Sequence, residues 1–165
     1  MIIVTSRLRI RELSVEDAEF VLRLVNEPAF IANIGDKGVR TIENARSFIS
    51  EGPWTCQEKP GYGQFLVDQK EDGDPVGICG LLFRDSLNVT DIGFAILAKH
   101  RGRGFALEAA KAVMNYGFSK LQIEEIVGLT SEANTASIRV LKKLGMKFDK
   151  VVKMSDDDPG TAVYR

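Results

Sequence analysis

Hydrophobic and polar residues alternate near the start of the chain. Arginines at positions 7, 9 and 11 flank Leu8 and Ile10, and this period of two predicts a strand over Arg7–Arg11 with both aliphatic residues facing inward. Short apolar runs separated by turns predict three more strands, at 65–67, 75–83 and 89–97. We expect these three strands to be antiparallel neighbours.

A helical spacing of apolar residues predicts four helices, over 15–27, 41–50, 104–121 and 135–144. We expect Pro28 to mark the end of the first helix and residues 29–40 to be irregular. Three further strands are predicted at 123–130, 147–154 and 161–165, the last of them a short strand at a sheet edge. Because a helix separates the strands at 89–97 and 123–130, these two should pair in parallel through a right-handed crossover.

The chain is organised around residues 91–107, where a buried strand leads into a glycine-rich turn and then an amphipathic helix. The turn reads Arg101-Gly102-Arg103-Gly104. Free N–H groups at a helix start carry the positive end of the helix dipole, so this order of elements builds a site for phosphate. Glycines let the backbone approach a ligand, and arginines add charge. Alone, the same residues fit an ordinary turn that opens a helix equally well.

Four sequence patterns occur in register with these elements: Ser6–Arg11, Asp91–Phe94, Arg101–Ala109, and Asn134–Ile138 leading to Lys143–Met146. Together they resemble the GNAT superfamily of acyl-CoA-dependent N-acyltransferases, and within it the branch named for ribosomal-protein N-terminal acetyltransferases. The turn is similar to that superfamily's pyrophosphate loop, Arg/Gln-x-x-Gly-x-Gly/Ala. The sequence departs from the branch at Phe94, where tyrosine is commoner, at Ala98, where proline is usual, and at Asp91, where glutamate is frequent.

The resemblance implies a mixed α/β (α+β) fold, in which a mostly antiparallel twisted sheet has one parallel pairing and helices on both faces. It implies an acetyl-CoA-dependent N-acetyltransferase acting on a primary amine, either of a small molecule or of a protein N-terminus. A non-catalytic acyl-CoA-binding sensor or interaction domain on the same fold is the alternative.

The resemblance also implies where acetyl-CoA would bind. Its implied contacts are Phe94, Ala95 and Ile96 along the pantetheine, the loop residues Arg101, Gly102, Arg103, Gly104, Phe105 and Ala106 at the pyrophosphate, Asn134 at the thioester end and Lys142 at the nucleotide end. Asn134 equally fits a helix N-cap, and Lys142 a charged last turn favoured by the dipole.

The expected reaction is direct attack of the amine on the thioester. The tetrahedral oxyanion needs a donor, for which a backbone N–H around Ile96 or Leu97 is the candidate. Ser137 resembles the acid of this branch that protonates the leaving thiolate, and otherwise fits an inert hydroxyl in a first helical turn. Asp91 is the candidate base, acting through a water, and otherwise fits a charge at a strand edge.

Composition bears on the number of domains, the kinds of partner and the location of the protein. The 165 residues are most simply one domain, 1–165, with 22 basic against 23 acidic side chains and a net charge of −1. Nucleic-acid binders usually show a basic excess, so we expect none as a partner. No stretch has the roughly 20 apolar residues of a membrane helix, and the N-terminus shows no secretory signal. We therefore expect no membrane partner and a cytoplasmic protein.

The cysteine and histidine content bears on metal and redox chemistry. Cys56 and Cys79 are expected to be free thiols in a reducing compartment. His100 is the one histidine and is expected to be a solvated turn residue, so we expect no metal site. Whether two copies form a homodimer is left open.

Overall fold

The computed structural model describes residues 2–54 and 59–165. Within these ranges, eight strands form one sheet in the order β1-β2-β3-β4-β5-β6-β8-β7. The strands are β1 (Ile2–Val4), β2 (Leu8–Glu12), β3 (Gly63–Gln69), β4 (Pro75–Arg84), β5 (Val89–Ile96), β6 (Ile126–Thr130), β7 (Phe148–Val152) and β8 (Thr161–Tyr164). Every pairing is antiparallel except that between β5 and β6, which confirms the predicted mixed sheet with one parallel pair.

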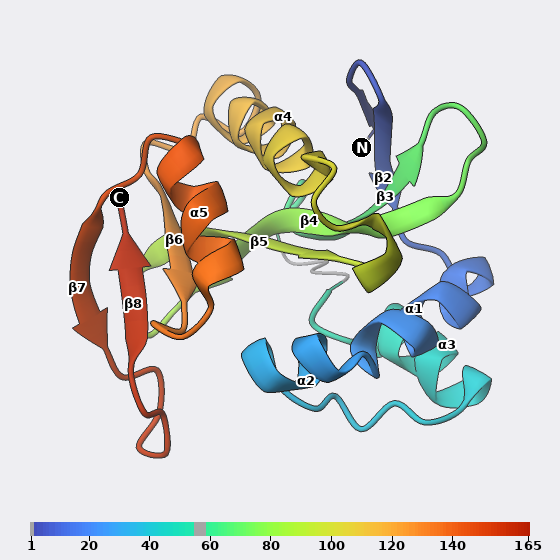
Figure 1. Cartoon of the computed structure of the whole chain (residues 1–165), viewed down its shortest axis with the longest axis horizontal. Coiled ribbons are helices and arrows are strands. Elements are labelled where there is room, and N and C mark those ends of the chain that lie inside the picture. Colours follow the sequence, from blue (N-terminus) through green and yellow to red (C-terminus); the bar gives the residue numbers. More distant parts are fainter. Residues whose placement is uncertain (1, 55–58) are drawn as a thin grey trace.

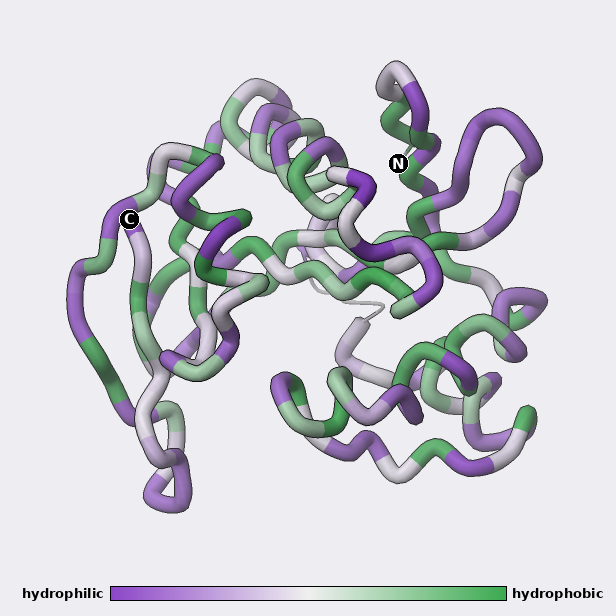
Figure 2. Tube along the Cα trace, in the orientation of Figure 1, coloured by the Kyte–Doolittle hydropathy of each residue, from purple (hydrophilic) through white to green (hydrophobic). Residues whose placement is uncertain are grey.

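Helices cover both faces of this sheet (Figure 1). They are α1 (Ala18–Val25), α2 (Pro28–Asn33), α3 (Ile42–Glu51), α4 (Phe105–Ser119) and α5 (Thr135–Lys143), with 3-10 turns at Val15–Asp17 and Ala98–His100. Side chains alternate along a strand, so Leu66 packs against the α1–α3 side, whereas Phe65 and Val67 pack with α4 and α5. Figure 2 shows the central strands β4 and β5 largely in hydrophobic colours and the β3–β4 turn in hydrophilic ones.

The start of α4 is fixed by one carboxylate. Glu108, in the first turn of α4, accepts hydrogen bonds from the Thr5 hydroxyl at 2.6 Å, the Arg7 backbone N–H at 3.0 Å and Arg7 Nε at 2.7 Å. Burial disfavours ionisation of Glu108, but these hydrogen bonds outweigh it and lower its pKa to about 2. Glu108 therefore anchors α4 to the β1–β2 hairpin as a carboxylate.

Two expectations about individual elements were wrong, and one strand was not predicted. Pro28 does not only follow α1: it is the first residue of α2, where its fixed φ and missing N–H are tolerated, so residues 29–40 are not wholly irregular. Residues 2–4 form a strand, which the sequence did not predict because the alternation of polar and apolar residues begins only at Arg7. The last strand, β8, is not at the edge, because its buried apolar residues place it between β6 and the exposed edge strand β7.

Candidate active site

The sheet opens between β5 and β6. These strands pair at only two positions, Thr90 with Ile126 and Asp91 with Val127. Beyond them β5 continues along β4 as far as Ile96, whereas β6 continues along β8 through residues 128–130. The two strands therefore diverge (Figure 1), and the β6-facing edge of β5 has no strand partner after Asp91.

Backbone groups on this open edge can be assigned from the pairing on the other side. The Leu97 N–H donates to the Val76 carbonyl at 2.9 Å, so odd-numbered residues of this strand direct their backbone groups toward β4. The Ile96 carbonyl points the other way and accepts from Arg101 Nε at 2.9 Å. The N–H groups of Phe94 and Ile96 therefore face the opening. Leu97, one of the two expected oxyanion donors, is excluded because its N–H is already used.

The glycine-rich turn lies at the same opening. Gly102 and Gly104 adopt the left-handed conformation, with φ of 75° and 80°, and Gly104 is the N-cap of α4. The first N–H groups of a helix have no intrahelical acceptor, and the backbone from Gly104 to Leu107 lines the cavity. The positive end of α4 is thus presented to this cavity.

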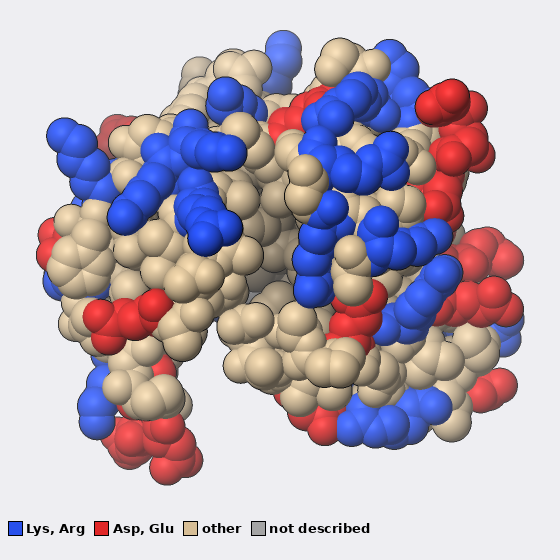
Figure 3. All heavy atoms as spheres, viewed as in Figure 1, with Lys and Arg blue, Asp and Glu red and all other residues tan. Residues whose placement is uncertain are grey.

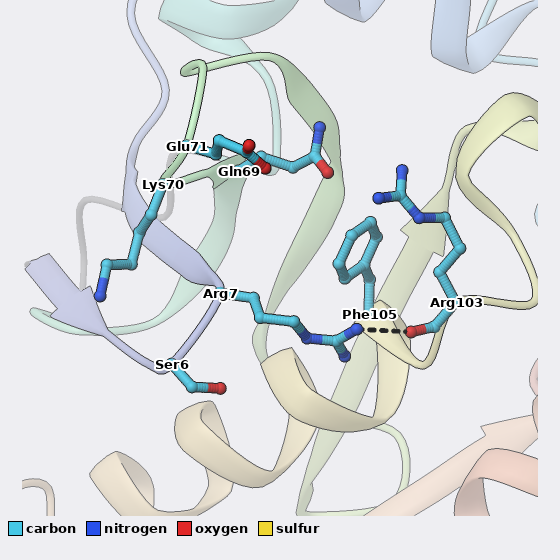
Figure 4. A pocket seen from close by; sticks show the side chains of 7 residues that line it. All are labelled: Ser6, Arg7, Gln69, Lys70, Glu71, Arg103 and Phe105. Atoms are coloured by element: carbon cyan, nitrogen blue, oxygen red, sulfur yellow. Dashed lines mark hydrogen bonds between the residues drawn. The ribbon is translucent and has the colours of Figure 1, made fainter.

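The two arginines of the turn lie in different places. Arg101 lines the cavity, where its Nη2 also bonds Glu27 Oε2 at 3.0 Å. Arg103 lines a separate, smaller pocket, and its guanidinium lies 4.7 Å from the centre of the Phe105 ring. Arg7 lies 4.8 Å from the same ring and donates to the Arg103 carbonyl at 2.9 Å (Figure 4). The structure therefore brings Arg101 to the cavity and Arg103 to the pocket beside it.

Asp91 lies at the point where β5 and β6 separate. Its side chain lines the cavity, is only 3% exposed, and pairs with Arg84, whose Nε lies 2.6 Å from Oδ1. Burial raises the pKa of Asp91, and the Arg84 charge opposes this only in part. Since Asp91 is paired on both sides by neighbouring strands, its interpretation as a strand-edge charge was wrong.

The start of α5 borders the cavity from the other half of the sheet. Asn134 Oδ1 accepts from the Ser137 N–H at 3.1 Å, which confirms the predicted N-cap, and both residues line the cavity. Ser137 is half-buried. Lys142 is exposed and does not line the cavity, whereas Arg139 and Lys143 do.

The cavity between the two halves has a volume of about 1030 Å³. Figure 3 shows lysine and arginine side chains on both sides of a hollow in the surface. Its lining includes residues that the sequence did not indicate: Lys37, Gln64, Arg84, Arg139 and Lys143. Only Arg84 carried a usable signal, because the 84–88 turn predicts that it lies near Asp91 across a hairpin. The others reach the cavity through long-range packing.

The structure corrects one further expectation and leaves another untested. His100 is not solvated: it is 6% exposed, and its Nε2 lies 3.0 Å from Asp74 Oδ2. Cys79 is a free, buried thiol, whose pKa is raised by burial, and Cys56 lies outside the described residues. Over residues 2–54 and 59–165, no cluster of metal-ligating side chains is found. No helix in those ranges is long and apolar enough to cross a membrane.

Comparisons with known proteins bear on the whole of this arrangement. A family model described as the acetyltransferase (GNAT) domain matches residues 7–147. The uncharacterized N-acetyltransferase YnaD of Bacillus subtilis (strain 168) is 29% identical over 153 residues, which cover 93% of this chain and 86% of that protein. The crystal structure of a GNAT-family acetyltransferase from Bacillus anthracis is similar with a TM-score of 0.80 at 26% identity, covering 99% of this chain and 95% of that one.

A more distant structure shares the fold. RimL, a ribosomal L7/L12 α-N-protein acetyltransferase solved in complex with coenzyme A, has a TM-score of 0.83 at 17% identity, over 99% of this chain and 96% of that chain.

Proposed function

This chain belongs to the acetyltransferase (GNAT) domain family and is an N-acetyltransferase, and we propose that it transfers the acetyl group of acetyl-CoA to a primary amine by direct attack in a ternary complex. The acceptor is the amine of a small molecule or a protein N-terminus. The observation that carries this proposal is the positive end of α4, which opens into the same cavity as the unpaired edge of β5.

The residues present fit acetyl-CoA, which supplies an activated acetyl thioester when bound. The backbone from Arg101 to Ala106 would bind the pyrophosphate through free N–H groups. Phe94, Ala95 and Ile96 lie along the open edge of β5, whose backbone groups suit the amides of pantetheine. Arg103 contributes positive charge from beside the loop rather than from the cavity.

The other end of α5 would lie near the nucleotide. Arg139 and Lys143 line the cavity and are nearer candidates for the nucleotide phosphates than Lys142, which does not line it. The opposite end of the same helix presents Asn134 and Ser137 toward the thioester. Helix α5 would therefore contact the cofactor along its length.

Three groups of the chain then have distinct chemical roles. Asp91 takes the proton of the incoming ammonium, directly or through a water, and its raised pKa makes it a better base than an exposed aspartate. The Ile96 N–H donates to the developing oxyanion. The Ser137 hydroxyl donates to the departing sulfur without adding charge. Direct attack on the thioester needs no covalent enzyme intermediate, and the buried Cys79 does not line the cavity.

The setting of this domain is part of the proposal. Residues 1–165 would act as one domain in the cytoplasm, without a nucleic-acid or membrane partner. The near-zero net charge of −1 supports the lack of a nucleic-acid partner. Whether two copies form a homodimer is tested by measuring the molecular mass in solution.

A thiol-release assay tests the proposed function. The purified chain is mixed with acetyl-CoA and a panel of amino acids, amino-acid amides, polyamines and short peptides, with a reaction lacking acceptor to measure hydrolysis. We expect acceptor-dependent release of CoA and an acetylated amine detectable by mass. A folded protein that binds acetyl-CoA but transfers acetyl to no amine would instead support the non-catalytic sensor.

A further inference from the structure

Two cations from distant parts of the chain line one region of the cavity. Arg84 is the last residue of β4, and Lys37 lies between α2 and α3. Both line the same cavity as Asp91, which Arg84 bonds directly, and the Lys37 side chain is exposed there. Partial desolvation and the charge of Arg84 lower the pKa of the Lys37 ammonium.

The carboxylates in this region do not balance both charges. Asp91 pairs with Arg84, and Lys37 forms no ion pair with any residue in the described part of the chain. Asp36, the neighbour of Lys37, bonds Arg40 and the Gly38 N–H instead. Among residues 2–54 and 59–165, the exposed ammonium of Lys37 is therefore left without a counter-ion.

Asp158 is the other carboxylate that lines the cavity among the described residues, and it is engaged within its own turn. Its oxygens accept from the Met154 N–H, the Gly160 N–H and the Thr161 hydroxyl, each at 2.8 Å. These bonds stabilise the β7–β8 turn and lower the pKa of Asp158. Asp158 does not act as the partner of Lys37.

The two cations retain free hydrogen-bond donors. Arg84 bonds Asp91 through Nε and, more weakly at 3.4 Å, through Nη2, so its Nη1 has no partner among the described residues. A carboxylate can accept simultaneously from a guanidinium and an ammonium, and charge-assisted bonds of this kind are stronger than neutral ones. Nearby, Ile31 and Ile34 line the cavity and stay 37% and 45% exposed, which gives this end an aliphatic wall.

From these contacts we infer that the acceptor amine carries a carboxylate, which binds Lys37 and Arg84 while the amine faces Asp91. This inference rests on the proposed function and specifies its substrate class. In an α-amino acid the amine and carboxylate share one carbon, and Asp91 and Arg84 are likewise direct neighbours. A polyamine would instead bring a second cation against Lys37, so it is disfavoured.

Matched acceptors separate the carboxylate from the rest of the molecule. Thiol release is compared for leucine and phenylalanine against their primary amides, for the C-terminally amidated dipeptide Ala-Asp against amidated Ala-Asn, and for spermidine. We expect kcat/KM at least about tenfold higher for each carboxylate than for its neutral partner, as a charge-assisted hydrogen bond implies. Preference confined to the free amino acids or to Ala-Asp identifies which source of carboxylate the site takes.

Variants of Lys37 then test the residue itself. Lys37→Gln should raise KM for the carboxylate acceptors about tenfold while changing KM for the amides little, and Lys37→Glu should reverse the preference. Lys111→Gln, which alters an exposed lysine of α4 outside the cavity, is the matched control. A structural role for Lys37 would weaken both acceptor types equally and would overturn the inference.

Calorimetric titration of acetyl-CoA into the same samples distinguishes failure of the proposed function from failure of the carboxylate inference. If the wild-type chain does not bind acetyl-CoA, the proposed function is overturned. Normal acetyl-CoA binding with equal use of amides and carboxylates, with a preference for spermidine, or with no transfer to any carboxylate would overturn only the carboxylate inference.

Discussion

Burial and an ion pair act on the acidity of Asp91 in opposite directions. The net result is a raised pKa, so the carboxylate can hold a proton at a less acidic pH than usual. The α-amine of a peptide has a pKa near 7.7–8.0, so a peptide acceptor needs a base mainly at lower pH. We predict that Asp91→Asn lowers turnover about a hundredfold near pH 6 and progressively less as the pH rises through 8.

The comparison for Asp91 is Ser137→Ala. Because a serine hydroxyl does not titrate in this range, loss of its hydrogen bond to the leaving sulfur should reduce turnover by a similar factor at every pH. Full pH–rate profiles of both variants, with acetyl-CoA affinity measured in parallel, provide the check. A flat deficit for Asp91→Asn would remove it as the base, and wild-type turnover in Ser137→Ala would remove the serine from the mechanism.

Glu108 is a second residue whose ionisation matters, here for stability. Its pKa is about 2 in the folded chain against 4.5 ordinarily, so the unfolded chain binds the proton more readily. Its stabilisation is thus complete above about pH 4.5, where it is worth about 3 kcal/mol, and is lost as the pH falls toward 2. Urea unfolding should show Glu108→Gln less stable at pH 7 by a margin of this order that shrinks with acid.

The exposed Glu19 of α1 offers the control for Glu108. Glu19→Gln should leave the free energy of unfolding within about 0.5 kcal/mol of wild type, as surface substitutions usually do. Equal destabilisation by both changes, or a Glu108→Gln deficit that persists undiminished at pH 2, would show that the hydrogen bonds to Thr5 and Arg7 do not depend on the charge.

At the scale of elements, local signals predicted what local physics determines. The alternation at Arg7–Arg11, the glycine turn before α4 and the Asn134 N-cap each depend on residues a few positions apart, and each appears in the structure. The interior position of β8 does not depend on neighbouring residues. It is decided by which of β7 and β8 buries more apolar surface against the rest of the sheet.

The same distinction applies to the candidate site. The loop from Arg101 to Ala106 and the pair Asn134–Ser137 were predictable, since each is a continuous motif at a helix start. Lys37 and Gln64 were not, because the irregular segment after α2 and the strand β3 reach the cavity only through the packing of the whole chain. Burial of His100 likewise depends on Asp74, a residue from another turn.

At the scale of the whole molecule, the cavity exists because two parts of the sheet are joined by very few strand pairings. Strands β1–β5 and β6–β8 meet at only two parallel residue pairs, and the cavity occupies the gap that follows. A ligand held by β5, the start of α4 and α5 therefore bridges both halves. Such binding to the folded state alone raises the free energy of unfolding by about 2.7 kcal/mol at a hundredfold excess over Kd.

Two glycines test directly whether the turn before α4 binds acetyl-CoA. Gly102, in that turn, and Gly73, in the β3–β4 turn, have φ of 75° and 73°, and an added Cβ would meet nothing within 4 Å at either. Alanine should therefore strain both positions equally, by about 1–2 kcal/mol. Only Gly102 lines the cavity.

Calorimetric titration of acetyl-CoA into Gly102→Ala, Gly73→Ala and wild type is the decisive measurement. The two variants should lose similar melting temperature, while Kd rises at least about tenfold in Gly102→Ala and stays at the wild-type value in Gly73→Ala. Equal acetyl-CoA affinity in all three proteins, or no binding by the wild type, would contradict the assignment of this turn as the pyrophosphate site.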